Sequence, residues 1–282
     1  MDVAGRRMDG LSLHYYTLPT GQWGKKGPAT GFAEDQWFST LKRTLRMDEL
    51  IAKHSAVMDK AEAEWKAAPR RGPGGDKKVG LVVDEWGTWY DQEPGSQPGF
   101  LYQQSSLRDA LVAALNFHVF HRHADRVTMA NIAQTVNVLQ AMILTDKEKM
   151  LRTPTYWVFE MFKVHQGGTV LPVELQSPDY AFGQEKIPMV SASATRAAGG
   201  SAVHLSLANT SPAQAVTLTV RLAGLAPKAV AGRVLTATAI DAHNTFAAPN
   251  AVQPAAFGGA SVKGDTLEVK LPAKSVVVLA LR

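Results

Sequence analysis

Two carboxylates and the three aromatic side chains that follow them make up the stretch of this chain best suited to chemistry. The stretch reads Asp84-Glu85-Trp86-Gly87-Thr88-Trp89-Tyr90 and comes directly after an apolar run, Val79–Val83. The run has no polar alternation, which is typical of a buried parallel strand, so Glu85 is expected at the carboxyl end of that strand. In α/β barrels the active site lies at this end. Flat aromatic rings pack on sugar faces and a carboxylate can act on an anomeric carbon, so the stretch indicates a sugar site.

The same residues also allow a purely structural interpretation. Asp84 and Glu85 would then cap the following helix, and Trp86 and Trp89 would belong to the hydrophobic core. In either case we expect Asp84 to anchor the strand end by bonding to backbone or to a neighbouring side chain, rather than to act on a substrate.

Histidines are the other residues whose chemistry suits catalysis or metal binding. His14 lies in a short strand candidate, Leu11–Tyr16, with no second ligand at metal-binding spacing near it, so a hydrogen-bonded histidine is expected. His118, His121 and His123 lie close together without a carboxylate at the matching turn. We expect them to mark the C-terminal end of a helix, where basic residues complement the helix dipole. The sequence therefore predicts no metal site.

The elements that position these residues alternate between strands and helices. Apolar residues at three- and four-residue steps predict helix over 33–68, and Ser106-Leu107-Arg108-Asp109 has the form of a capping box that opens another helix. Strands are predicted at Leu11–Tyr16, Val79–Val83 and Arg126–Ala130. This order of strands and helices favours a parallel sheet with right-handed crossovers.

The composition changes near residue 170 towards Ala, Val, Thr and Gly. Segments of strand-like pattern then follow one another between Ser-Pro, Ala-Pro and Gly-Gly breaks, at 202–207, 216–220, 267–271 and 276–281. Short strands with regular turn signals predict an antiparallel β-sandwich, here a structural appendage. We therefore divide the chain into residues 1–165 and 166–282, with Met150–Glu174 making the connection.

Composition and charge exclude several classes of function. The chain has 282 residues and no cysteine, which excludes disulfides, thiol catalysis and thiolate metal sites. The net charge is +5, but the basic residues are scattered except in one Gly/Pro loop, Arg70–Lys78, and no nucleic-acid partner is expected. No apolar run is long enough for a membrane span, so no membrane partner is expected. The first residues lack the apolar core of a signal peptide, and localisation stays open.

A family resemblance spans nearly the whole chain. Five segments carry it, in this order: Leu13-His14-Tyr15-Tyr16, Asp84-Glu85-Trp86, Met129–Gln140, Thr153-Pro154-Thr155-Tyr156 and Asp241–Phe246. They resemble segments of glycoside hydrolase family 51, the α-L-arabinofuranosidases. The resemblance implies a (β/α)8 TIM barrel followed by a β-sandwich of jelly-roll type. It also implies retaining hydrolysis of terminal α-L-arabinofuranosyl groups in arabinan and arabinoxylan, with an arabinofuranose-containing polysaccharide or oligosaccharide as partner and no cofactor.

The resemblance assigns roles at three strand ends. Glu85 corresponds to the catalytic nucleophile at the end of barrel strand seven, and Tyr16, at the end of strand six, to the tyrosine that hydrogen-bonds the nucleophile. Gln134, after strand eight, corresponds to a glutamine that binds sugar hydroxyls, and Trp89 to the aromatic beside the bound sugar. The predicted substrate-binding residues are Trp89, Gln134, His14 and Trp86.

The second carboxylate of the family is missing from its expected place. The family acid/base is the Glu of an Asn-Glu pair at the end of strand four, and this sequence contains no Asn-Glu dipeptide. A full barrel takes roughly 250 residues, whereas about 165 precede the expected sandwich. The chain thus resembles the C-terminal half of the enzyme, with strands six to eight only. Glu34 and Glu93 are the loop glutamates near the barrel rim that could substitute, and Gly87 stands where many members have Asn.

Two hypotheses follow for the function. The first is an α-L-arabinofuranosidase whose missing N-terminal half-barrel is supplied from elsewhere, or whose open parallel edge is covered in a homo-oligomer. The alternative is a non-catalytic truncated remnant, or a weak carbohydrate-binding module that uses Trp86, Trp89 and the sandwich.

Overall fold

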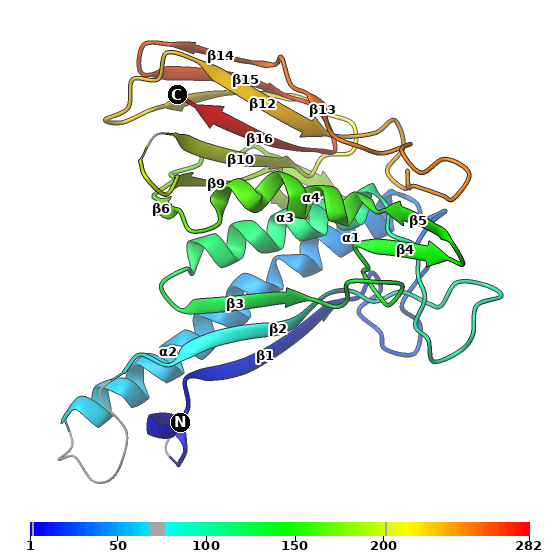
Figure 1. The fold of residues 1–282 in the computed structure, drawn as a ribbon, viewed down its shortest axis with the longest axis horizontal. Helices are drawn as coiled ribbons and strands as arrows, with labels where there is room; N and C mark the ends of the chain where they lie inside the picture. Colours follow the sequence, from blue (N-terminus) through cyan, green and yellow to red (C-terminus); the bar gives the residue numbers. More distant parts are fainter. Residues whose placement is uncertain (2, 68–76, 201) are drawn as a thin grey trace.

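Three parallel strands form one layer of the molecule (Figure 1). The computed structural model describes residues 1, 3–67, 77–200 and 202–282. Strands β1 (Gly10–Thr17), β2 (Gly80–Thr88) and β3 (Val127–Ile132) pair in the order β1-β2-β3, and both pairs are parallel. The three strands predicted in this half are confirmed. Residues 70–76 of the Gly/Pro loop expected at Arg70–Lys78 lie outside the described residues.

Helices connect the parallel strands, and α1 and α3 lie between their sheet and the rest of the molecule (Figure 1). The predicted helical region 33–68 forms two helices, α1 (Glu34–Thr44) and α2 (Arg46–Ala67), after a short 3-10 turn η1 (Gly5–Arg7) near the start of the chain. Helix α3 (Leu107–Arg122) begins at the predicted capping box, where the Ser106 N–H donates to Asp109 Oδ2 at 2.7 Å. The sequence order of strands and helices therefore builds the expected crossovers.

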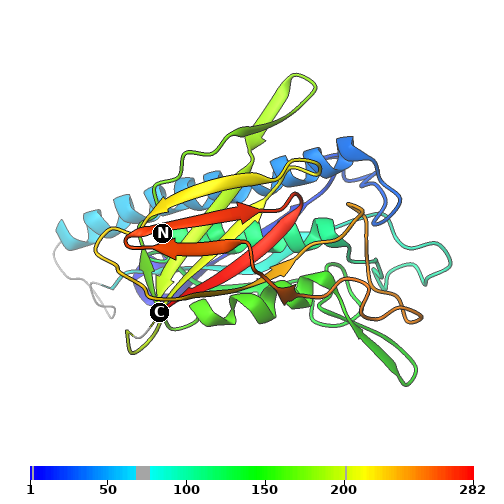
Figure 2. The ribbon, with the colours of Figure 1, turned by 90° about the horizontal axis from the view of Figure 1, so that it is seen from above.

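Antiparallel sheets make up the last part of the chain (Figures 1 and 2). A six-stranded sheet has the order β13-β12-β16-β10-β9-β6, and a three-stranded sheet, β11-β15-β14, lies above it in Figure 1. Their bounds are β6 (Thr169–Leu171), β9 (Val190–Arg196), β10 (Val203–Asn209), β11 (Val216–Arg221), β12 (Val230–Leu235), β13 (Ala255–Ala256), β14 (Ala260–Lys263), β15 (Thr266–Leu271) and β16 (Ser275–Leu281). The predicted strands at 202–207, 216–220, 267–271 and 276–281 are confirmed as β10, β11, β15 and β16.

Two hairpins and one further helix complete the fold. The hairpins are β4 (Ile143–Asp146) with β5 (Lys149–Arg152), and β7 (Asp179–Phe182) with β8 (Glu185–Pro188). Helix α4 (Pro154–Phe162) begins at Thr153, whose hydroxyl accepts the Tyr156 N–H at 3.3 Å, and continues into a 3-10 turn, η2 (Lys163–His165). None of the described helices is both long and apolar enough to cross a membrane.

Helix α3 is the element around which both parts of the chain pack. Its residues from Leu107 to Leu115 are all buried, and one hydrophobic cluster extends from it to β2 on one side and to β10 and β16 on the other. The parallel sheet and the antiparallel sheets therefore share a single core. Burial of this apolar surface stabilises their relative position as well as each sheet.

Three histidines lie in this interface and not at a solvated helix end. Each imidazole pairs with a hydroxyl at alternate positions of β9, in a set that we call the histidine–hydroxyl ladder. The pairs are His118–Ser191 at 2.9 Å, His121–Ser193 at 2.8 Å and His165–Thr195 at 2.8 Å. Burial lowers the pKa of His118 well below its usual range, that of His121 to about 4 and that of His165 to about 3.

The predicted dipole role is therefore wrong for two of the three histidines near the end of α3. His118 and His121 are neutral near pH 7 and act as hydrogen-bonding partners of β9. His123 stays at the helix end as expected, and its Nε2 lies 2.7 Å from Asp48 Oδ1. The difference arises because β9 packs against α3, and the sequence of the helix alone does not show this packing.

Candidate functional site

The carboxyl ends of β1 and β2 bring a histidine, a tyrosine and two carboxylates together. His14 pairs with Glu85 across the two strands, and Ser12 pairs with Val82, so β2 has one residue more than β1 over this interval. Such a bulge changes the direction of the side chains around it. It lets Asp84 and Glu85, which are adjacent in sequence, both approach His14.

Tyr16 and Glu85 are in direct contact, as predicted. The Tyr16 hydroxyl donates to Glu85 Oε2 at 2.7 Å, and Nδ1 of His14 lies 3.4 Å from the same oxygen. Burial, together with the neighbouring carboxylate that accepts its hydrogen bond, raises the pKa of Tyr16, so the phenol keeps its proton. The side chain of Glu85 is 47% exposed, which leaves its carboxylate open to a ligand while Tyr16 orients it.

Asp84 bonds to neighbouring side chains, as expected from the sequence, although β2 continues past it to Thr88. Its Oδ1 accepts the Ser12 hydroxyl at 2.7 Å and lies 3.1 Å from Nε2 of His14. The Ser12 hydrogen bond is the main cause that lowers the pKa of Asp84. His14 thus lies between two carboxylates, which fixes the plane of its ring beside Glu85. In the described ranges, no group of three or more His, Asp or Glu is arranged to hold a metal ion.

Trp89 lies beside this pair, and a second tryptophan follows it. The Trp89 and Tyr16 rings make an edge contact with centroids 5.0 Å apart. The backbone N–H of Trp89 donates to the backbone carbonyl of Thr17 at 3.1 Å. Trp23, from the loop after β1, packs edge-on against Trp89 at 4.8 Å and is 62% exposed. Sequence reasoning missed Trp23. Its position seven residues after Tyr16, in the loop that leaves the same strand end, is the signal that could have found it.

The predicted substrate-binding role of Trp86 is wrong. Its side chain is completely buried, with its ring stacked parallel to Phe159 and edge-on to Phe117 and Phe120. Adjacent residues of a strand point to opposite faces, so Glu85 and Trp86 face different sides of β2. The core interpretation therefore holds for Trp86, while Trp89 belongs to the cluster around Glu85.

Gln134 lies at the same end of the sheet, beyond β3. The N–H of the preceding residue, Ala133, donates to Trp86 O at 2.9 Å, and the Gln134 N–H donates to Val138 O at 3.1 Å. Its side chain is exposed. Its predicted contact with sugar hydroxyls stays a prediction.

The two glutamates considered as substitutes for the acid/base have other partners. Glu34 is the first residue of α1 and accepts the Tyr180 hydroxyl at 2.9 Å. Glu93 accepts the Gln104 N–H at 3.2 Å in the loop after β2. Neither contact involves Glu85, Tyr16 or His14.

Comparisons with known proteins agree on one family. The profile described as the alpha-L-arabinofuranosidase C-terminal domain matches residues 84–275. An intracellular exo-alpha-L-arabinofuranosidase of Bacteroides ovatus is 46% identical, over 100% of this chain and 52% of its own length. An intracellular exo-alpha-(1->5)-L-arabinofuranosidase of Streptomyces lividans is 29% identical, over 94% of this chain and 38% of its own length.

A solved structure gives the same result. The crystal structure of the GH51 arabinofuranosidase from Xanthomonas axonopodis pv. citri has a TM-score of 0.90 and 53% sequence identity, and the match covers 98% of this chain and 53% of that one. The chain thus spans about half the length of the Bacteroides ovatus relative and of the Xanthomonas axonopodis structure.

Proposed function

Because the chain belongs to the α-L-arabinofuranosidases of glycoside hydrolase family 51, we propose that it carries the nucleophile side of a retaining arabinofuranosidase site. The substrate would be a terminal, non-reducing α-L-arabinofuranosyl group of arabinan, arabinoxylan or an oligosaccharide derived from them. One observation carries the proposal. At the carboxyl ends of two parallel strands, a solvent-accessible carboxylate, Glu85, is oriented by the hydroxyl of Tyr16 at 2.7 Å, with Trp89 beside it.

The chemistry would proceed in two steps. The Glu85 carboxylate attacks the anomeric carbon, the bond to the leaving oxygen breaks, and a carboxylic acid gives that oxygen its proton. A covalent glycosyl-enzyme intermediate results. Water then attacks the same carbon, loses a proton to the former acid and releases Glu85. The two substitutions together retain the anomeric configuration. Trp89 would flank the sugar ring, while His14 and Gln134 would bond to its hydroxyls.

The acid of the first step has no counterpart among the described residues near Glu85. Retaining enzymes place the two carboxyl groups about 5–5.5 Å apart. The neighbouring carboxylate, Asp84, is held by Ser12 and His14, and its lowered pKa keeps it ionised rather than ready to donate a proton. We therefore propose that the acid/base group lies outside these 282 residues.

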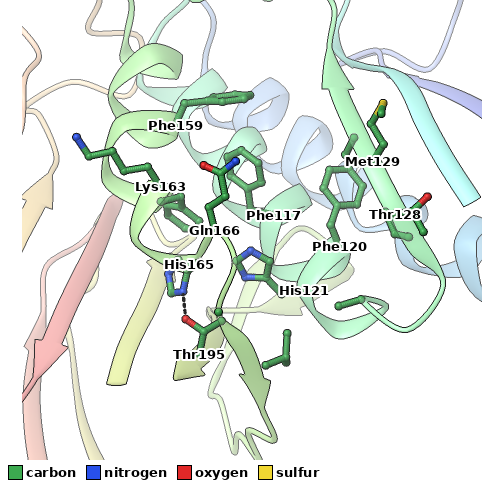
Figure 3. Close-up of a pocket in the computed structure, with 16 residues that line it drawn as sticks. Phe117, Phe120, His121, Thr128, Met129, Phe159, Lys163, His165, Gln166 and Thr195 are labelled. Carbon is green, nitrogen blue, oxygen red and sulfur yellow. Dashed lines mark hydrogen bonds between the residues drawn. The ribbon is translucent and has the colours of Figure 1, made fainter. Parts of the chain in front are cut away.

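The edges of the parallel sheet support a barrel that continues beyond this chain. Strands β1 and β3 each pair only with β2 within the described residues, so each has a free edge. Beside β3, an apolar pocket of about 600 Å³ is lined by aromatic side chains of α3 and α4, with the half-exposed Met129 at its rim (Figure 3). We propose that further strands and helices of a (β/α)8 barrel cover these surfaces, with 1–165 as barrel and 166–282 as jelly-roll sandwich.

Labelling of Glu85 tests the proposed role of this chain. The purified chain is treated with a dinitrophenyl α-L-arabinofuranoside, whose leaving group needs little protonation, and Glu85 is examined by mass spectrometry. We expect slow labelling of Glu85, none in Glu85→Gln, and unchanged labelling in Glu93→Gln. Natural arabinosides should not be turned over by the chain alone.

The alternative is a non-catalytic remnant or a weak sugar-binding module. It predicts that arabinosides bind without labelling Glu85, at equal affinity in Glu85→Gln. Full turnover of natural arabinosides with no label on Glu85 would overturn the proposed nucleophile as well as the external acid.

A further inference from the structure

Two side chains extend the cluster around Glu85 outward. Trp23 lies against Trp89, which lies against Tyr16, so these contacts lead step by step away from the carboxylate. The Lys26 ammonium lies 4.9 Å from the centroid of the Trp23 ring and 5.7 Å from that of Trp89. A cation and an exposed aromatic side chain therefore lie next to the proposed arabinofuranosyl position.

The loop that carries these side chains is held in place from β2. Asp91, just after that strand, accepts the N–H groups of Lys26 at 3.0 Å and Gly27 at 2.9 Å through its two carboxylate oxygens. Its own N–H donates to Gly27 O at 2.9 Å. Because three hydrogen bonds fix the loop, Trp23 and Lys26 are positioned before any ligand arrives, which reduces the entropy cost of binding.

The charge of Lys26 has no carboxylate partner here. Within the residues that the structure describes, no Asp or Glu oxygen lies within 4.0 Å of its ammonium, and the nearby Asp91 carboxylate is occupied by backbone N–H groups. An ammonium has three N–H donors. The Lys26 ammonium can therefore stay over the indole rings of Trp23 and Trp89 and still donate a hydrogen bond to an anionic group on the side away from these rings.

We propose that Trp23 and Lys26 form a second sugar position, which selects an acidic neighbour of the arabinofuranosyl group. The inference rests on the proposed function, because it places the first sugar at Glu85. The second sugar packs against the exposed part of the Trp23 side chain beside Lys26. Its carboxylate, that of a uronic acid, accepts hydrogen bonds from the Lys26 ammonium. Substrates with a uronic acid beside the arabinofuranosyl group are then preferred over neutral ones.

A matched pair of ligands tests this preference. The probes are an α-L-arabinofuranosyl-galactose disaccharide and its galacturonic acid counterpart, which differ only in CH2OH against carboxylate. Binding to the full chain is measured by calorimetry at low salt and at high salt, with methyl α-L-arabinofuranoside as the single-sugar reference. We expect the acidic disaccharide to bind about two- to fivefold tighter, as for an exposed ion pair, and the difference to disappear in high salt.

Two variants assign that preference to the proposed residues. Lys26→Gln should remove the preference for the acidic ligand and leave the affinity for the neutral one unchanged. Lys25→Gln makes the same charge change one residue away and should keep the preference. Trp23→Ala should weaken both disaccharides more than it weakens methyl α-L-arabinofuranoside.

The outcomes separate this inference from the function on which it rests. If neutral and acidic disaccharides bind equally, or Lys25→Gln removes the preference as fully as Lys26→Gln, the second position is refuted and the site at Glu85 stands. If no arabinoside binds, or binding is the same in Trp89→Ala, the proposed sugar site fails and the inference fails with it.

Discussion

At the scale of single residues, Glu85 owes its orientation to neighbours on another strand. Its carboxylate is half exposed, and its contacts are with Tyr16 and His14 of β1. The family resemblance predicted the contact between Tyr16 and Glu85, and the strand pattern predicted that both residues lie towards the ends of strands. Sequence reasoning placed Trp86 wrongly, although the alternation of side chains along a strand already sets Trp86 opposite Glu85. It missed Trp23, because the ring contact with Trp89 joins two loops that are far apart in sequence.

Replacing Tyr16 with Phe tests the orientation of the carboxylate. A hydrogen bond to a charged group is worth about 1.5–3 kcal/mol. Tyr16→Phe should therefore slow the labelling of Glu85 by the activated arabinofuranoside by about 10- to 100-fold. Tyr15→Phe is the matched control, because that hydroxyl donates to Arg43 O and not to Glu85. Equal labelling rates in the two variants would show that Tyr16 does not position the nucleophile.

At the scale of elements, local sequence patterns predicted the strands that bury apolar side chains on one face or on both faces. Strands β1, β2, β3, β10, β11, β15 and β16 all carry an apolar run or an apolar alternation that is visible in the sequence. Strand β9 was missed because it reads Val-Ser-Ala-Ser-Ala-Thr-Arg, with small and hydroxyl-bearing residues. Those hydroxyls face imidazoles of α3 and η2, so the strand needs little apolar surface there. The bulge before Glu85 was also invisible, because it depends on register with β1.

The backbone near the end of β2 favours glycine at position 87. Its φ is +143°, and a Cβ there would lie 3.2 Å from Gln140, whose side chain accepts the Thr88 N–H at 2.8 Å. Gly87→Ala should therefore lower the free energy of unfolding by about 1–3 kcal/mol, measured by denaturant titration. Gly258→Ala, where a Cβ meets nothing within 4 Å, should change it by less than about 0.5 kcal/mol. Equal effects of the two substitutions would contradict the backbone argument.

At the scale of the whole molecule, the two parts of the chain meet through a polar interface inside an apolar core. Helix α3 contributes His118 and His121, and η2 contributes His165, to the histidine–hydroxyl ladder on β9. Neutral imidazoles satisfy the hydroxyls without bringing charge into the core. The sequence showed the histidines but not this function, because their partners lie 30 to 73 residues away along the chain.

Acid should loosen this interface before it protonates most carboxylates. The pKa of His121 is lowered to about 4 in the folded protein, against about 6.5 when unfolded. Stability from the neutral ladder is therefore complete above about pH 6.5 and is lost as the pH falls from there towards the folded pKa. At pH 5 we expect a loss of about 1–2 kcal/mol from His121 alone.

Thermal unfolding followed between pH 7.5 and pH 5 (a range above the usual carboxylate pKa values) measures this loss. His121→Gln keeps a side chain that can bond to Ser193 but removes the titrating group, so its melting temperature should fall less steeply with acid than that of the parent chain. His54→Gln replaces a histidine of α2 that bonds to Leu50 O and lies outside the ladder, and it should keep the parent slope. A parent slope that His121→Gln leaves unchanged would mean that protonation at the interface does not control acid stability. The shallower dependence of melting temperature on pH that we expect in His121→Gln follows from the burial of a neutral imidazole between α3 and β9.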